Sequence, residues 1–145
     1  ILQMKSKTIR IKSPGPPENM CWEDIEIPSP VAGHVTLKHS YIGLNYIDTY
    51  HRSGLYPLPL PATIGMEAAG EVIELGKETE FLNIGDKVVY AMGPPGSYSD
   101  IRNIPENKLI KAFGARSIPS NIVSFHINFP EFDQFFISSR NFSCR

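Results

Sequence analysis

Short alternating segments separated by proline and glycine place the tightest limit on what this chain can fold into. The 145 residues include 13 prolines and 11 glycines, which interrupt regular structure and favour turns over long helices. Between these breaks apolar and polar residues alternate, as in half-buried strands. Strands are predicted over residues 7–12, 21–27, 33–42, 88–91, 97–103 and 108–111 and within 65–76. So many short strands predict a mainly β, closed or nearly closed structure with short helices.

Two of these segments carry more detailed expectations. In 33–42 the alternation predicts that Val35, Leu37, His39 and Tyr41 share one face of a strand. Gly70 lies inside a strand pattern, which indicates either a bulge or a close approach of another backbone.

A single short helix is predicted over residues 45–52. Asn45 is a suitable N-cap, and Gly54 lies just beyond the expected end. The following segment, 55–61, alternates with proline and predicts a stiff, extended loop.

Bulk composition excludes several classes of protein. The formal net charge is −1, so nothing predicts binding to nucleic acid or to anionic lipid. No apolar run is long enough to span a membrane. The first residues lack the apolar core of a secretory signal, which predicts a cytoplasmic location.

Composition changes abruptly near residue 111. Seven of the eight phenylalanines follow it, at positions 113, 125, 129, 132, 135, 136 and 142. We therefore predict one domain over 5–111 and a divergent tail over 112–145 that is not a domain. The tail reads either as a frameshifted or readthrough segment, or as a lineage-specific extension that packs on the domain.

Four motifs, in this order and spacing, resemble a known family. They are 42–57 (IGLNYIDTYHRSGLYP), 65–70 (GMEAAG), 85–91 (GDKVVYA) and 96–99 (GSYS). Together they resemble the zinc-free, zeta-crystallin-like quinone oxidoreductases of the medium-chain dehydrogenase/reductase superfamily. The resemblance covers residues 5–111.

The resemblance implies a fold and an activity. The fold is a GroES-like barrel, the catalytic domain of these enzymes, which in the family precedes a Rossmann domain that binds NADPH. The activity is hydride transfer from NADPH to a quinone or an activated carbonyl acceptor. Full-length relatives of this kind are expected to be homo-oligomers.

The same resemblance implies that no zinc is bound. Zinc-dependent relatives have cysteine where this chain has Asn45 and histidine where it has Met66, and neither replacement suits a catalytic zinc. Glu67 follows the second position. It is either a structural hydrogen-bond acceptor or a functional carboxylate.

Without a metal, hydrogen-bond donors must stabilise the oxygen that gains negative charge. By resemblance, Asn45 and Tyr50 are the candidate catalytic residues, Asn45 and Asp48 the cofactor-binding residues, and Tyr50 and Tyr56 the substrate-binding residues. Asn45 also reads as a helix cap, and the tyrosines as packing aromatics.

A dinucleotide-binding fingerprint is missing, because none of the 11 glycines forms a Gly-x-Gly pair. We therefore expect a catalytic-domain portion that lacks the Rossmann domain, truncated and inactive alone. The alternative is a non-catalytic barrel, either a binding or assembly module or a decayed gene product. A third reading is assembly with a separately encoded Rossmann partner.

Overall fold

A computed structural model describes residues 4–112 of the chain. These residues form helix α1 (Tyr46–Ser53), the short 3-10 turns η1 (Pro17–Asn19) and η2 (Glu106–Lys108), and eight strands. The strands are β1 (Met4–Ile11), β2 (Met20–Ile27), β3 (His34–Gly43), β4 (Ala62–Thr63), β5 (Glu67–Leu75), β6 (Lys87–Ala91), β7 (Ile101–Pro105) and β8 (Ile110–Lys111). The predicted tail, apart from its first residue, lies outside the described residues.

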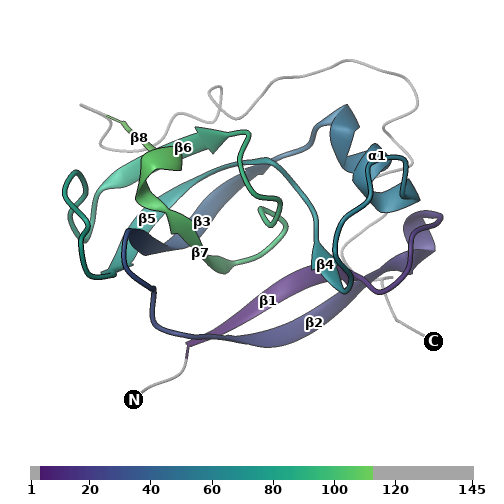
Figure 1. Cartoon of the computed structure of the whole chain (residues 1–145), viewed down its shortest axis with the longest axis horizontal. Coiled ribbons are helices and arrows are strands. Elements are labelled where there is room, and N and C mark those ends of the chain that lie inside the picture. The colour runs from purple at the N-terminus through teal and green to yellow at the C-terminus, as the bar shows by residue number, and fades with distance from the viewer. Residues whose placement is uncertain (1–3, 113–145) are drawn as a thin grey trace.

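The strands form two antiparallel sheets. The larger has the order β7-β3-β5-β6-β8, and the smaller has the order β2-β1-β4. Figure 1 shows the β1–β2 hairpin running beneath the larger sheet, with α1 at one end. The prediction of a mainly β structure with short helices is confirmed.

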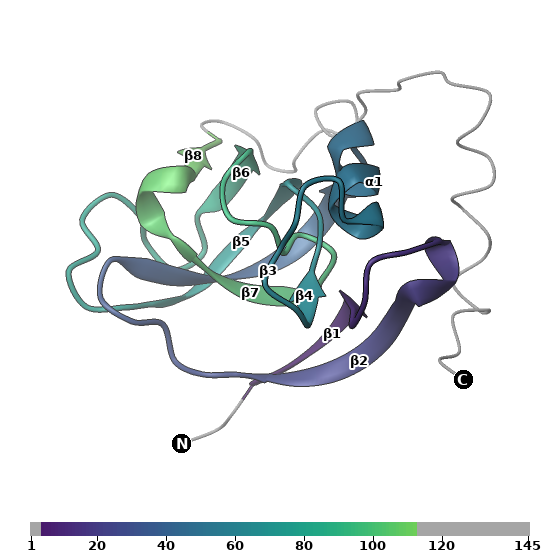
Figure 2. The same ribbon diagram turned by 45° about the vertical axis from the view of Figure 1, so that its right-hand side comes forward.

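Contacts between β1 and the segment before β7 close the two sheets onto each other. Thr8 bridges to Ser99, and the backbone N–H of Asp100 donates to the Lys7 carbonyl over 2.9 Å. The buried Ser6 hydroxyl accepts the backbone N–H of Ile101, also over 2.9 Å. Figure 2 shows β1 passing beside β7 and β4. The result is a partly closed barrel.

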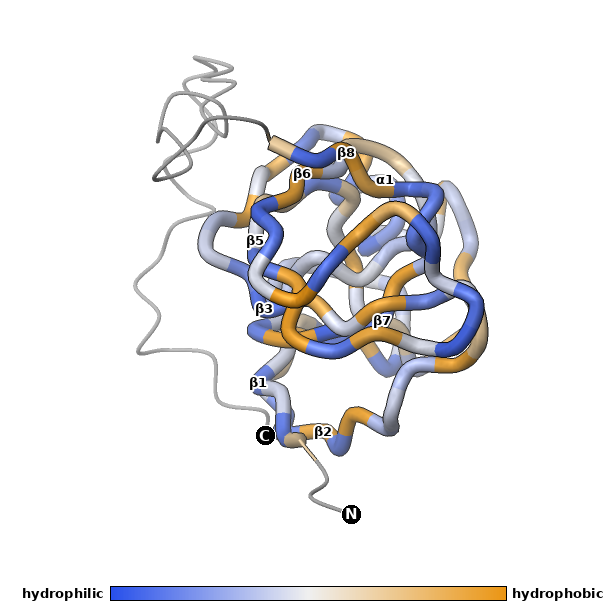
Figure 3. The backbone as a smooth tube through the Cα atoms, turned by 90° about the vertical axis from the view of Figure 1, so that its left-hand side faces the viewer, coloured by the Kyte–Doolittle hydropathy of each residue, from blue (hydrophilic) through white to orange (hydrophobic). Residues whose placement is uncertain are grey.

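Two apolar clusters fill the interior. The larger lies within the five-stranded sheet, and its fully buried members include Val35, Leu37, Val72, Val88 and Ile104. Burying each such side chain contributes roughly 1.5–3 kcal/mol. Figure 3 shows apolar residues recurring between polar ones along the strands, as half-buried strands require.

The predicted alternation in β3 fails at its far end. Val35 and Leu37 are buried, but Tyr41 is 39% exposed. Ile42 is also exposed, at 40%, so neither side of β3 is buried at these positions, which lie just after a register shift against β5 between His39 and Tyr41. The close approach expected at Gly70 is confirmed, because a Cβ there would lie 2.3 Å from the Lys38 carbonyl oxygen.

The strand predicted over 97–103 is wrong in its first half. β7 begins only at Ile101, because the backbone N–H groups of Gly96 and Ser97 both donate to the carbonyl of Gly65. Within the described part of the chain, no helix has the length and apolar character needed to cross a membrane.

Candidate functional site

Helix α1 and its N-cap residue carry most of the candidate site. Asn45 occupies the N-cap position with extended backbone angles, and Gly54 ends the helix at φ 84°. A left-handed residue at this point suits glycine, which has no Cβ to clash. The helix predicted over 45–52 is confirmed, shifted by one residue.

Asn45 is held at two points by carboxylates. Its side-chain Nδ2 donates to Oε2 of Glu67 over 2.8 Å, and its backbone N–H donates to Oδ2 of Asp48 over 3.0 Å. Gly43, paired with Glu67 across the strands, provides the space, because a Cβ at Gly43 would lie 2.5 Å from the Glu67 carboxyl carbon. The N-cap is thus tied both to its own helix and to β5.

Asp48 is buried, at 2% exposure, and its carboxylate accepts hydrogen bonds from other groups of the protein. Oδ2 accepts the Tyr98 hydroxyl over 2.8 Å as well as the Asn45 N–H. Burial raises the pKa of Asp48, with the hydrogen bonds opposing this, and burial also raises the pKa of Tyr98 well above its ordinary value. Tyr98 lies 50 residues further along the chain, so this bond joins the loop after β6 to α1.

Three tyrosines form a row along α1 and the loop after it. The ring centroids of Tyr46 and Tyr50 lie 5.2 Å apart and those of Tyr50 and Tyr56 lie 5.3 Å apart, both edge to face. Tyr46 is 52% and Tyr56 49% exposed. The row therefore presents aromatic surface to solvent at both of its ends, from the first turn of the helix to the loop after it.

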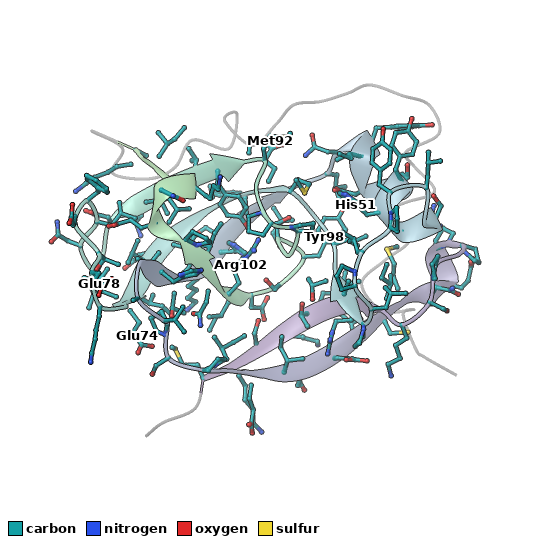
Figure 4. The ribbon with its side chains drawn as sticks, viewed as in Figure 1. His51, Glu74, Glu78, Met92, Tyr98 and Arg102 are labelled. Carbon is teal, nitrogen blue, oxygen red and sulfur yellow. The ribbon has the colours of Figure 1, made fainter. Side chains whose placement is uncertain are left out.

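The loop that carries Tyr98 is anchored from the larger sheet. His39 Nδ1 lies 2.6 Å from the Ser99 carbonyl oxygen, so this nitrogen carries the proton. His39 Nε2 then accepts the Tyr90 hydroxyl over 3.0 Å, and Arg102 donates to the same hydroxyl and to the Pro94 carbonyl. In Figure 4, Tyr98 and His51 lie toward the end of the barrel that carries α1, while Glu74 and Glu78 lie at the opposite end.

The structure brings the four residues predicted for the site together as two pairs. Asn45 contacts Asp48, and Tyr50 contacts Tyr56. In residues 4–112 no hydrogen bond or ring contact joins one pair to the other. Sequence reasoning gave no role to Tyr98, although it lies in one of the four recognised motifs.

Metal-ligating side chains do not gather in this part of the chain. Among the described residues, no three side chains of His, Cys, Asp or Glu come together in a way that could hold a metal ion. Met66, next to Glu67, is buried at 8% exposure.

Comparison with known proteins gives the family. The model of the alcohol dehydrogenase GroES-like domain matches residues 31–114. A quinone oxidoreductase of Pseudomonas aeruginosa is 43% identical over 106 residues, which cover 72% of this chain and 33% of that protein.

Solved structures agree. A quinone oxidoreductase of Pseudomonas syringae aligns with a TM-score of 0.74 and 42% identity, over 78% of this chain and 34% of that one. The quinone oxidoreductase of Escherichia coli, solved in complex with NADPH, aligns with a TM-score of 0.73 and 37% identity, over 77% and 34%.

The chain therefore belongs to the alcohol dehydrogenase GroES-like domain family and, within it, to the quinone oxidoreductase branch of the medium-chain dehydrogenases/reductases. The predicted GroES-like fold is confirmed, and the described residues contain no Rossmann domain. The chain spans about a third of the length of the relatives it matches.

Proposed function

We propose that this chain supplies the GroES-like catalytic portion of an NADPH-dependent quinone oxidoreductase. The observation that carries the proposal is the Asn45 amide, fixed by Glu67 at the start of α1, the helix that also carries Tyr46 and Tyr50 of the tyrosine row. The named activity of the relatives and the NADPH in one of them support the same conclusion.

NADPH, when bound, supplies a hydride to the acceptor. Hydride addition to a quinone or an activated carbonyl leaves negative charge on an oxygen. The Asn45 amide keeps one N–H beyond the one it gives to Glu67, and within residues 4–112 no hydrogen bond occupies the Tyr50 hydroxyl. We assign these two donors to the acceptor oxygen, and the Tyr56 ring to the wall beside the acceptor.

Asp48 has a different role from that of a direct cofactor ligand. Its carboxylate is buried and already accepts two hydrogen bonds, from Asn45 and Tyr98. We therefore propose that Asp48 contributes to the cofactor site through Asn45, whose position it fixes, rather than by touching the nicotinamide.

Zinc does not fit this arrangement, so the proposed chemistry is zinc-independent. The Asn45 nitrogen is an amide N–H donor bonded to Glu67, and the neutral amide oxygen that remains is not among the usual ligands of zinc. The buried Met66 thioether is a soft, neutral donor that does not suit catalytic zinc.

The remaining proposals follow from the family and the composition. The acceptor is a quinone or an activated carbonyl compound, the full-length protein is a cytoplasmic homo-oligomer, and nucleic acid and membranes are not partners. The net charge of −1 supports the last of these.

We propose that the 145-residue chain has no activity by itself, because none of its glycines forms the Gly-x-Gly pair of a dinucleotide fingerprint. The purified chain, given NADPH and a simple quinone, is expected to leave the absorbance of NADPH at its starting value. Steady oxidation of NADPH would contradict this part of the proposal.

A chimera tests the catalytic part. Residues 4–112 would replace the matching segment of the Pseudomonas aeruginosa quinone oxidoreductase, and the parent enzyme would serve as the control. The chimera is expected to oxidise NADPH with a quinone and to lose most of that activity on Asn45→Ala. A folded chimera that binds NADPH without turnover would instead favour the non-catalytic barrel.

A further inference from the structure

We infer that Glu67 and Tyr98 are positioning residues that fix Asn45 from two sides. The inference rests on the proposed donor role of Asn45. It concerns how the donor is held, and so can be tested in the chain without cofactor or acceptor.

Glu67 fixes the side chain of Asn45. A carboxylate only accepts hydrogen bonds, so the 2.8 Å contact requires Nδ2, rather than the amide oxygen, to face Glu67. This choice leaves the second N–H and the carbonyl oxygen of the amide directed elsewhere. The absence of a side chain at Gly43 lets the Glu67 carboxyl reach this position, since a Cβ there would lie 2.8 Å from Oε2.

Tyr98 fixes the backbone of Asn45 through Asp48. The Asp48 Oδ2 atom accepts both the Tyr98 hydroxyl and the Asn45 N–H, while the buried Oδ1 atom has no hydrogen-bond partner among residues 4–112. Without the Tyr98 hydroxyl, Asp48 would keep a single hydrogen bond for a buried carboxyl group. The carboxyl would then lose one of the two hydrogen bonds that fix its orientation, so it would hold the N-cap in place less firmly.

The short segment 64–67 positions both Tyr98 and Glu67. The carbonyls of Ile64 and Gly65 accept the backbone N–H groups of Tyr98 and Gly96 over 3.1 and 2.9 Å. Gly65 has φ 97°, and a Cβ there would lie 2.3 Å from the Tyr98 ring. Glu67 begins β5 two residues later. The motifs that contain Gly65 and Tyr98 therefore meet each other, and each reaches Asn45 through a carboxylate, the first through Glu67 and the second through Asp48.

The competing explanation is that Tyr98 only packs the core. It belongs to the apolar cluster of Ile11, Met20 and Ile64, and is 8% exposed. Loss of stability on mutation would not separate the two explanations. The test must therefore report on Asn45 itself.

The experiment is NMR of the side-chain amide of Asn45 in the ¹⁵N-labelled 145-residue chain. Asn45→Ser identifies its two proton signals by their disappearance. We expect one signal to be shifted downfield by the Glu67 carboxylate, to lose that shift in Glu67→Ala and to regain part of it in Glu67→Gln. Tyr98→Phe is expected to broaden or move both signals.

Thr36→Val is the matched control, because it removes another buried hydroxyl, one that donates to Asn103 between β3 and β7 and takes no part in anchoring the Tyr98 loop. It is expected to leave both Asn45 signals in place. Unchanged signals in Tyr98→Phe or in Glu67→Ala would overturn the inference. In the unsubstituted chain, the Tyr98 hydroxyl proton should show a nuclear Overhauser effect to the Asn45 backbone N–H, since both donate to one oxygen. Its absence would also overturn the inference, even if Tyr98→Phe failed to fold.

A failure of the proposed function would give a different combination of NMR signals and NADPH oxidation from a failure of the positioning roles. Variants of the chimera that move the Asn45 signals as expected yet keep full NADPH oxidation would show that Asn45 is held as inferred but is not the donor. Unmoved signals together with activity that depends on Asn45 would leave the function intact and remove the positioning roles.

Discussion

The rings of Tyr50 and Tyr56 meet edge to face, with centroids 5.3 Å apart and planes inclined by 67°, although helix α1 ends between them. The left-handed Gly54 turns the chain back, and the backbone N–H of Tyr56 donates to the Tyr50 carbonyl over 3.2 Å. Tyr50 is therefore fixed between a helix and a turned-back loop. The Tyr50 hydroxyl is thereby held in one position, from which it can donate a hydrogen bond.

Replacing Tyr50 by phenylalanine separates the hydroxyl from the ring. In the chimera, Tyr50→Phe is expected to lower kcat by roughly a hundredfold, the usual effect of losing one donor to a developing oxyanion. The KM for the quinone should change little, because the ring and its contact with Tyr56 remain. Steady-state kinetics at saturating NADPH measures both constants.

Tyr46→Phe is the control for this experiment. It removes the hydroxyl of the neighbouring, half-exposed ring, which has no assigned role in the reaction. Its kcat should stay within about twofold of the parent chimera. Equal losses in the two variants would indicate that the row of rings acts through packing and that the Tyr50 hydroxyl is not a donor.

The sequence predicted best the features that depend on neighbouring residues. Helix α1 was predictable because the N-cap Asn45 and the terminating Gly54 lie next to the segment they limit. The close approach at Gly70 was predictable for a related reason, since glycine within a strand pattern has few other causes.

Features that depend on distant residues were not predictable. The bond between Tyr98 and Asp48 spans 50 residues, and nothing local to either residue indicates the other. Tyr41 and Ile42 are exposed on both sides of β3, which alternation within one strand does not reveal, because it depends on what other elements cover that end of the strand. The family resemblance indicated that Asn45, Asp48, Tyr50 and Tyr56 belong to one site. Which of them contact each other became known only from the three-dimensional structure.

Acid is expected to destabilise the barrel through His39. Burial lowers the pKa of His39 to about 4, from 6.5 for a free histidine, and nearby Arg102 adds to this effect. Between these pH values the unfolded chain binds the additional proton, so the free energy of unfolding falls as the pH falls from 6.5 to about 4. The full loss would be about 3 kcal/mol.

Urea denaturation at a series of pH values measures this loss. His39→Gln provides the comparison, because glutamine can still form hydrogen bonds but does not titrate. The variant is expected to be less stable at neutral pH and to have a shallower dependence on pH over this interval. Parallel curves for the variant and the unsubstituted chain would show that His39 is not the titrating group.

Glu106 holds the loop before β6. Its buried carboxylate accepts the backbone N–H groups of Glu80, Phe81 and Leu82 over 2.9, 2.8 and 2.8 Å. Burial alone would raise the pKa of Glu106, but these three hydrogen bonds outweigh it and the pKa is lowered. The stabilisation is therefore present at neutral pH and is lost as the pH falls below the ordinary value of 4.5.

Glu106→Gln is expected to lower the free energy of unfolding at neutral pH by about 1–3 kcal/mol, because an amide has only one accepting oxygen for the three N–H groups. Glu80→Gln is the control, since that side chain is exposed and should change stability by no more than about 0.5 kcal/mol. Denaturant melts of the two variants measure the difference. A loss in Glu106→Gln no larger than that in the control would mean that the carboxylate does not hold the loop.

Alanine substitutions at Gly65 and Gly85 separate the cost of backbone strain from the cost of a steric clash. Both have left-handed φ, 97° and 91°, so alanine at either position costs about 1 kcal/mol for the backbone. At Gly85 no atom of the described part of the chain lies within 4 Å of the added Cβ, whereas at Gly65 it would meet the Ser97 hydroxyl at 2.2 Å and the Tyr98 ring at 2.3 Å. Gly65→Ala should therefore cost a further 1–3 kcal/mol or so, the usual effect of overpacking. Thermal and urea denaturation compare the two variants directly, and equal losses would show that Tyr98 does not pack against Gly65 as described.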